Sequence, residues 1–266
     1  MMRALAAEFL KLKRSRMPLW TGLAVLVYSG LNLAILPVVT SPESQSKMAT
    51  AGPVFAKAIA AGIYVPTWAN LLHFGPQGIA GSWGVLVFGL VTAYVFGREF
   101  GEGTAQTMLT LPLRRVNVVL AKMTVVAVWV SGLTLLSVLL NTVVVALLGA
   151  SGFAWTHVLK SLTESLEVSA LLYLTLPFVA WFAMLGKGYL RPILFSLAMM
   201  IFGNALVTTG ASRWFPWNMP MHVVGASWYP IPPSNLLPAS WVVAVAAFLL
   251  GLGVLIWRTD HADSAL

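Results

Sequence analysis

The sequence contains no cysteine, which excludes a disulfide framework, a thiolate metal site and a cysteine nucleophile. Charged residues are also scarce, at 9% of the chain, whereas a soluble globular domain carries roughly a quarter. The sequence has no GxxxxGK[ST] loop to cradle a nucleotide, and neither an HExxH zinc motif nor a GxSxG nucleophile elbow. We therefore expect neither enzymatic activity nor a metal or cofactor bound by this chain.

Long apolar runs dominate the sequence instead, with 59% hydrophobic residues and a mean hydropathy of +0.85. Several runs reach the roughly 20 residues that a helix needs to cross the hydrocarbon core of a bilayer. The sequence therefore predicts an all-α integral membrane protein with a single transmembrane domain over 1–266. Its six predicted membrane spans are 20–39, 78–97, 118–148, 168–185, 192–209 and 239–257.

The segments between these runs also have recognisable patterns. Residues 1–17 place Leu5, Phe9 and Leu12 on one helical face, which predicts an amphipathic helix lying at the membrane interface. The alternative is a basic flank that only orients the first span. Prolines break 40–77 into short interfacial helices, and 210–238 is an outer loop rich in aromatic residues that favour the interface.

The basic residues are unevenly distributed between the two sides of these spans, and the formal net charge is +8. One side has Arg3, Lys11, Lys13, Arg14, Arg16, Arg98, Arg114, Arg115, Lys122, Lys187, Arg191 and Arg258; the other has Lys47, Lys57, Lys160 and Arg213. Because cytoplasmic loops are enriched in Lys and Arg, both termini are expected in the cytoplasm, with the chain in a bacterial-type inner membrane. The bases flank spans, which indicates contact with membrane lipid and not with nucleic acid.

Two spans have features that bear on helix packing. In the second, Gly81, Gly89, Ala93 and Gly97 recur at multiples of four, so another helix can approach that face closely. The third, 118–148, is longer than the hydrocarbon is thick and must tilt or project. Its cytoplasmic end would continue directly from the preceding loop, so that this helix could act as a lever moved by the loop.

Strongly polar residues are rare inside the spans. The main ones are Asn32, Asn141, Tyr173 and Asn204, which either join helices by hydrogen bonds or line a polar substrate path. Ion-driven carriers usually need ionisable groups inside the membrane, and Glu167, at an outer boundary, is the one near candidate. His73, His157, His222 and His261 are expected in loops or the tail.

A charged stretch, 98–122, separates the second and third spans, with its loop at 98–117. Gly103 permits a sharp reversal, Thr104 can cap a short helix, and Pro112 ends that helix after Leu111. Met108, Leu109 and Leu111 give the predicted helix an apolar face, which favours a partner groove or the membrane surface. The alternative is a solvated connector that is basic only because it faces the cytoplasm.

The run Glu99, Gly103, Thr104, Leu111-Pro112, Arg114 and Lys122 resembles the pattern of ABC type-2 exporter permeases, including the small permeases of bacitracin or lantibiotic self-protection and of sodium efflux. Leu113 departs from it, since family loops often have a basic or hydroxyl residue there. The resemblance implies that the loop contains a coupling helix that docks on an ATPase. The implied coupling residues are Glu99, Glu102, Gly103, Thr104, Thr107, Met108, Leu109, Pro112, Arg114, Arg115 and Lys122.

This resemblance predicts a permease subunit that works with a P-loop ATPase, which would bind ATP and Mg, and with a second permease subunit, identical or different. The apolar spans favour a hydrophobic or amphiphilic cargo such as a peptide antibiotic, a lipid or a drug-like molecule. A non-transporting membrane scaffold or assembly subunit is the main alternative, followed by an ion-coupled secondary transporter.

Overall fold

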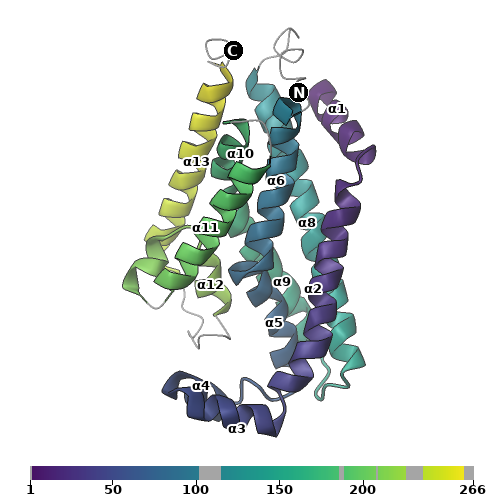
Figure 1. Cartoon of the computed structure of the whole chain (residues 1–266), viewed down its shortest axis with the longest axis vertical. Helices are drawn as coiled ribbons and strands as arrows, with labels where there is room; N and C mark the ends of the chain where they lie inside the picture. Colours follow the sequence, from purple (N-terminus) through teal and green to yellow (C-terminus); the bar gives the residue numbers. More distant parts are fainter. Residues whose placement is uncertain (1, 102–114, 186–188, 208, 226–235, 261–266) are drawn as a thin grey trace.

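The computed structural model describes residues 2–101, 115–185, 189–207, 209–225 and 236–260. Within these ranges the chain is helical, and its one β-bridge joins Thr67 to Ser151. The helices form an elongated bundle with both chain ends at one end (Figure 1). They are α1 (Met2–Lys13), α2 (Met17–Val39), α3 (Pro42–Ala51), α4 (Pro53–Ala60), α5 (Trp68–Gly81), α6 (Trp83–Gly101), α8 (Arg115–Leu147), α9 (Trp155–Tyr173), α10 (Leu176–Met184), α11 (Leu190–Leu206), the 3-10 turn η1 (Gly210–Trp214), α12 (Met219–Val224) and α13 (Pro238–Asp260).

Three of the described helices are long and apolar enough to cross a membrane: α2, α8 and α13. Two bent pairs, α5 with α6 and α9 with α10, would raise the number of spans to five, and α11 is a shorter apolar helix. The helix that leads into the predicted second span begins at Trp68, earlier than residue 78, and a 47° bend at Ser82 separates α5 from α6. Likewise, α9 continues without a break from the predicted outer segment 151–167 into the predicted fourth span, and a 41° bend separates it from α10.

The core lies around α6 and α8. Phe88 and Val91 of α6 and Val126 of α8 are fully buried in the main hydrophobic cluster, which α10 completes with Ala180 and Ala183. With 33 residues, α8 is about 50 Å long, as the lever prediction requires. In contrast, α2 and α13 expose much of their apolar surface, as helices at the rim of a membrane bundle do.

The small residues of α6 form a tight contact, as their spacing predicts. Ala93 is fully buried, and a Cβ added at Gly97 would lie 3.7 Å from the Cβ of Ala183 in α10. At Gly89 an added Cβ would collide with Ser196 of α11. Gly81 belongs to α5 and faces Met221 of α12. Helices α10 and α11 thus pack directly on the backbone of α6.

Helix α1 lies along the bundle at the end with the termini (Figure 1), and it packs against α8. Leu5, Phe9 and Leu12, the predicted apolar face, contact the main hydrophobic core. The helix is amphipathic as predicted, but its apolar face covers protein. That contact anchors α1 to the membrane body.

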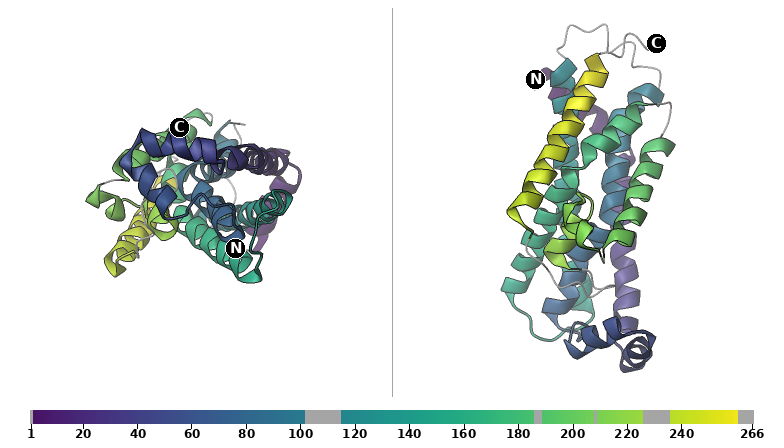
Figure 2. Two further views of the ribbon diagram at one scale, coloured as in Figure 1. Left: turned by 90° about the horizontal axis from the view of Figure 1, so that it is seen from below. Right: turned by 90° about the vertical axis from the view of Figure 1, so that its left-hand side faces the viewer.

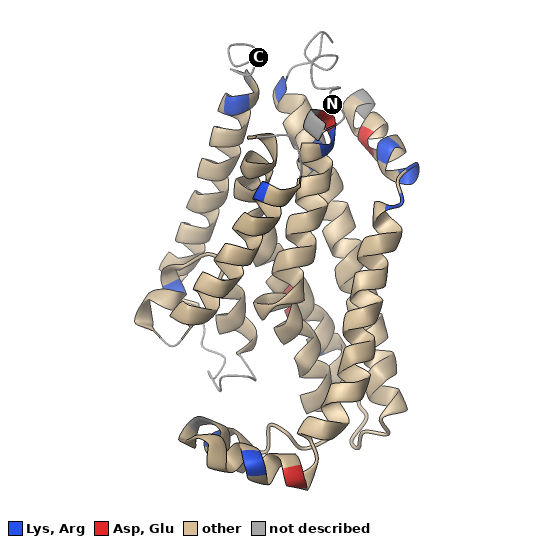
Figure 3. Ribbon diagram, viewed as in Figure 1, with Lys and Arg blue, Asp and Glu red and all other residues tan. Residues whose placement is uncertain are grey.

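Charge is concentrated at the two ends of the bundle, and the ribbon between them is mostly uncharged (Figure 3). One charged end has the termini; the other has α3 and α4, which cross the opposite end of the bundle (Figure 2). This second end has a salt bridge between Lys47 and Glu43, whose side chains are 74% and 78% exposed. The separation fits a membrane body whose two ends face water.

Candidate coupling site

Three helices meet at the end of the bundle that holds the termini. Helix α6 ends there at Gly101 and α8 begins there at Arg115, so both flank the stretch 102–114 of the predicted coupling loop. Helix α1 lies against them. The C-terminal end of α13 joins the same group, because Arg115 donates a hydrogen bond from Nη1 to the carbonyl oxygen of Thr259 at 2.8 Å.

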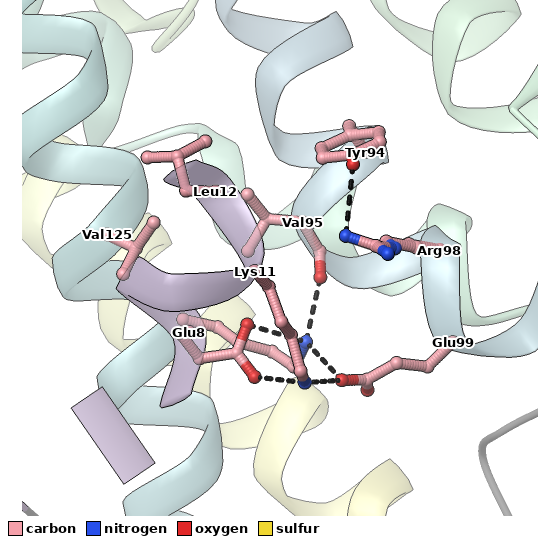
Figure 4. Close-up of a pocket in the computed structure, with 9 residues that line it drawn as sticks. Glu8, Lys11, Leu12, Tyr94, Val95, Arg98, Glu99 and Val125 are labelled. Carbon is pink, nitrogen blue, oxygen red and sulfur yellow. Dashed lines mark hydrogen bonds and ion pairs between the residues drawn. The ribbon is translucent and has the colours of Figure 1, made fainter. Parts of the chain in front are cut away.

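Four charged side chains link these helices, and we call them the ion cluster: Glu8 and Lys11 of α1, Glu99 of α6 and Lys122 of α8. Lys11 Nζ lies 2.7 Å from both Glu8 Oε1 and Glu99 Oε1. Lys122 Nζ lies 3.0 Å from Glu99 Oε1 and 3.5 Å from Glu8 Oε2, and it donates to the carbonyl oxygen of Val95 at 2.8 Å. Each base therefore contacts both acids (Figure 4).

The ion cluster is largely shielded from water. The side chains of Lys122, Glu8 and Glu99 are 5%, 8% and 10% exposed, whereas that of Lys11 is 39% exposed. Burial acts to lower the pKa of Lys11, but the hydrogen bonds and charges of Glu8 and Glu99 outweigh it and raise that pKa above the ordinary value of 10.5. Since charges buried this deeply are tolerated only when paired, the arrangement fixes α1, α6 and α8 relative to one another.

A hydrogen-bonded chain reinforces this junction on the side of α2. Tyr94 of α6 donates its hydroxyl to Ser15 Oγ at 2.7 Å and accepts from Arg98 at 3.2 Å. Ser15 in turn accepts from the backbone N–H of Met17, the first residue of α2. The connection between α1 and α2 is thus tied to α6 independently of the ion cluster.

A small pocket of about 20 Å³ opens beside the ion cluster, lined by residues that include Leu12, Tyr94, Val95 and Val125. That volume holds about one water molecule and no cargo. Among the described residues, no group of three or more His, Asp or Glu side chains is arranged to hold a metal ion. The cluster is therefore suited to joining helices mechanically.

Of the predicted coupling residues, the structure brings Glu99 and Lys122 together, although they are separated by the whole loop. It places Arg115 apart from them, against α13. The others lie outside the described residues: Glu102, Gly103, Thr104, Thr107, Met108, Leu109, Pro112 and Arg114.

Sequence reasoning missed Glu8 and the pairing role of Lys11. A signal was present, because Glu8 falls between Leu5 and Leu12 on the apolar face of an otherwise basic helix. An acid at the centre of an apolar stripe is costly unless a base meets it. The amphipathic pattern showed the face, but not which partner would cover the acid.

The four polar residues considered for a substrate path do not gather in one place. Asn141 of α8 donates to the carbonyl oxygen of Leu72 in α5, and Tyr173 of α9 donates to that of Met123 in α8. Asn204 bonds to Met200 within α11 and, at 3.4 Å, to Gly81, while Asn32 is in α2. Asn141 and Tyr173 each join two helices, which favours a helix-pairing role for them.

Two comparisons show which known proteins this chain is similar to. Residues 4–203 match the family model described as "ABC-2 family transporter protein". The chain is also 26% identical over 174 residues to the bacitracin transport permease protein BCRB of Bacillus licheniformis. That alignment covers 65% of this chain and 82% of the relative.

Proposed function

Because the chain belongs to the ABC-2 family of transporter proteins, and is thus a membrane subunit of an ABC transporter, we propose that it is the permease of an exporter powered by a separate P-loop ATPase. ATP and Mg bind the ATPase and not this chain. Two permease subunits and two ATPase subunits form the working unit, and both termini of this chain face the cytoplasm in a bacterial inner membrane.

The observation that carries this proposal is the ion cluster at the two ends of the coupling loop. When the ATPases close, they push on the coupling helix that the sequence predicts at 104–111. Because Glu99 and Lys122 are paired, α6 and α8 move as one unit, and Glu8 and Lys11 extend that unit to α1. A displacement of a few ångströms at the loop then reaches the far end of α8, about 50 Å away.

The cargo is amphiphilic, and a peptide antibiotic of the bacitracin kind is the best candidate. The relative is named as a bacitracin transport permease, which supports this class, as do the apolar spans and the scarcity of charge between the two ends of the bundle. Export of such a peptide would protect the cell that makes or meets it. The alternative with most support is a lipid or drug-like amphiphile moved by the same rocking of α6 and α8.

The test is docking of the partner ATPase, co-expressed with this chain. In the variant Met108→Asp with Leu109→Asp, the apolar face of the coupling helix becomes acidic, so co-purification of the ATPase should fall at least about tenfold while the permease stays in the membrane. The matched control, Thr50→Asp with Ala51→Asp, adds the same charges to exposed positions of α3 and should bind normally.

A transport assay distinguishes a permease from a scaffold. Cells with the permease and its ATPase should survive a higher bacitracin concentration than cells whose ATPase cannot hydrolyse ATP. If the ATPase binds but survival does not depend on hydrolysis, the chain does not export bacitracin, and either the alternative cargo or a non-transporting scaffold applies.

A further inference from the structure

A second pair of ionisable residues lies in the bent helix pairs, away from the ion cluster. His73 was expected in a loop, but the structure places it within α5, facing α9 and α12. Its Nδ1 lies 2.9 Å from Oε2 of Glu164 in α9, and its Nε2 lies 2.6 Å from the carbonyl oxygen of Val224, the last residue of α12. The two side chains are only 28% and 16% exposed.

The hydrogen bonds of His73 fix how many protons the pair must hold. A carbonyl oxygen only accepts, so Nε2 must carry a hydrogen to bond Val224. In neutral histidine Nδ1 would then be an unprotonated acceptor facing a carboxylate oxygen, which repels it. The contact becomes favourable only with one more proton, either on Nδ1 beside ionised Glu164 or on Glu164 itself.

We propose that His73 and Glu164 form a binding site for a single proton, and that the occupied site fastens α12 to α5 and α9. The proposal goes beyond the permease function and uses none of its coupling residues. When the proton leaves, neutral His73 has one hydrogen and two oxygens to satisfy. It must release either Glu164 or Val224, and because an ionised carboxylate is the stronger acceptor, it keeps Glu164 and releases Val224, so α12 loses its bond to His73 of α5.

Few other charges face this site. On α9, Lys160 lies 3.8 Å from Glu164 Oε1, but its side chain is 70% exposed, so its effect is strongly screened, and Glu167 is exposed. His222 of α12 faces Ser212 of η1, and burial and Arg213 lower its pKa. On α5 itself, the nearby polar group is the neutral Gln77, and α8 offers Asn141, which is also neutral.

Helix α12 is the element that the site controls. Its C-terminal carbonyl group, on Val224, accepts from both His73 and Gln77, and these bonds replace helical partners missing at a helix end. Its other residues, such as Met219 and Met221, are buried against α5 and α9. Loss of the His73 bond leaves only the longer bond from Gln77, at 3.3 Å, on this carbonyl among the described contacts.

The absence of cysteine provides a clean test. The full chain in lipid nanodiscs receives Met221→Cys, a buried reporter in α12, and the rate of maleimide labelling is measured across pH 5 to 9. Because thiol reactivity itself rises with pH, each rate is divided by the rate of the same reporter in Glu164→Gln. That variant is the matched control: its amide donates to neutral Nδ1, so both links persist at every pH without the additional proton.

The proposal predicts a normalised rate near one at low pH for the protein that carries only the Met221→Cys reporter. At high pH the rate should rise on the order of tenfold, which is the effect of about one lost buried hydrogen bond. His73→Ala should label quickly at every pH. A flat normalised ratio would overturn the proposal, as would Glu164→Gln labelling as quickly as His73→Ala. If His73→Ala fails to fold, the comparison of the reporter protein with Glu164→Gln still tests the proposal, because glutamine has the same shape as the glutamate that it replaces.

Discussion

Two ionic sites in the described part of the chain, the ion cluster and the pair of His73 and Glu164, differ in how their charges balance. The ion cluster pairs two acids with two bases, so ionised partners satisfy one another. The pair of His73 and Glu164 faces a backbone carbonyl as well, and its contacts require one additional proton. The first arrangement suits a permanent joint between helices, whereas the second suits a contact that opens and closes. The residues around a buried charge thus decide whether that charge holds helices together permanently or makes their contact respond to pH.

The largest effect should come from removing the most buried base of the ion cluster. In Lys122→Met, Glu8 and Glu99 lose one of their two bases, and an uncompensated buried charge typically costs about 3–5 kcal/mol. We expect a lower midpoint of thermal unfolding in detergent and loss of transport. A variant as stable as the parent would show that the cluster is not a joint.

A smaller effect is expected for Glu8→Gln, which keeps the shape of the side chain but removes its charge. Helix α1 keeps its apolar contacts through Leu5, Phe9 and Leu12, so the expected loss is about 1.5–3 kcal/mol, as for a charged hydrogen bond. ATPase co-purification should persist while transport per ATP hydrolysed falls. If ATPase co-purification and transport fall equally, α1 has no role in coupling apart from its role in ATPase docking.

The pH dependence of cysteine labelling should also distinguish the ion cluster from the pair of His73 and Glu164. The pKa of Lys11 is raised, so its stabilising contribution is fully present below 10.5 and is lost only as the pH rises above that value. Between pH 5 and 9, labelling of a cysteine at Leu12, which is beside the cluster, should therefore follow the thiol's own titration alone. Additional opening in that range would contradict the assignment of a permanent joint.

The smallest effect is expected at the exposed salt bridge of α3. Lys47→Met removes an ion pair that water screens on both sides, and such pairs contribute about 0.5 kcal/mol or less. The unfolding midpoint should barely move, and transport should be unchanged. This variant is the matched control for Lys122→Met, since the same substitution is made outside the buried cluster.

Much of the fold was predictable because hydrophobic runs report membrane spans directly. The long helix, the small-residue face of α6 and the amphipathic α1 all followed from composition and spacing. The bends were not predictable, because glycines and prolines around Ser82 and Thr175 are compatible with either a break or a continuous helix. The proposed topology, with six spans and cytoplasmic termini, stays a prediction.

The candidate sites also have a part that the sequence predicts and a part that it does not. Glu99 and Lys122 could be named from the sequence pattern, but their contact depends on how α6 and α8 pack. Glu8 and the helical position of His73 were missed because the partners that decide their roles lie far away in sequence: Lys122 of α8 for Glu8, and Glu164 of α9 and Val224 of α12 for His73. Residue type alone did not distinguish a paired histidine within a helix from one in a loop.

The most direct test of the coupling account is a distance between spin labels on α1 and α8 in the complex with the ATPase. Labels on cysteines at Leu10 and Val116, which are 57% and 38% exposed, report whether these helices move together. The account predicts the same distance without nucleotide and with trapped ATP in the parent protein, and a distance that changes with ATP in Lys122→Met. A distance that changes with ATP in the parent, or stays fixed in both proteins, would contradict it.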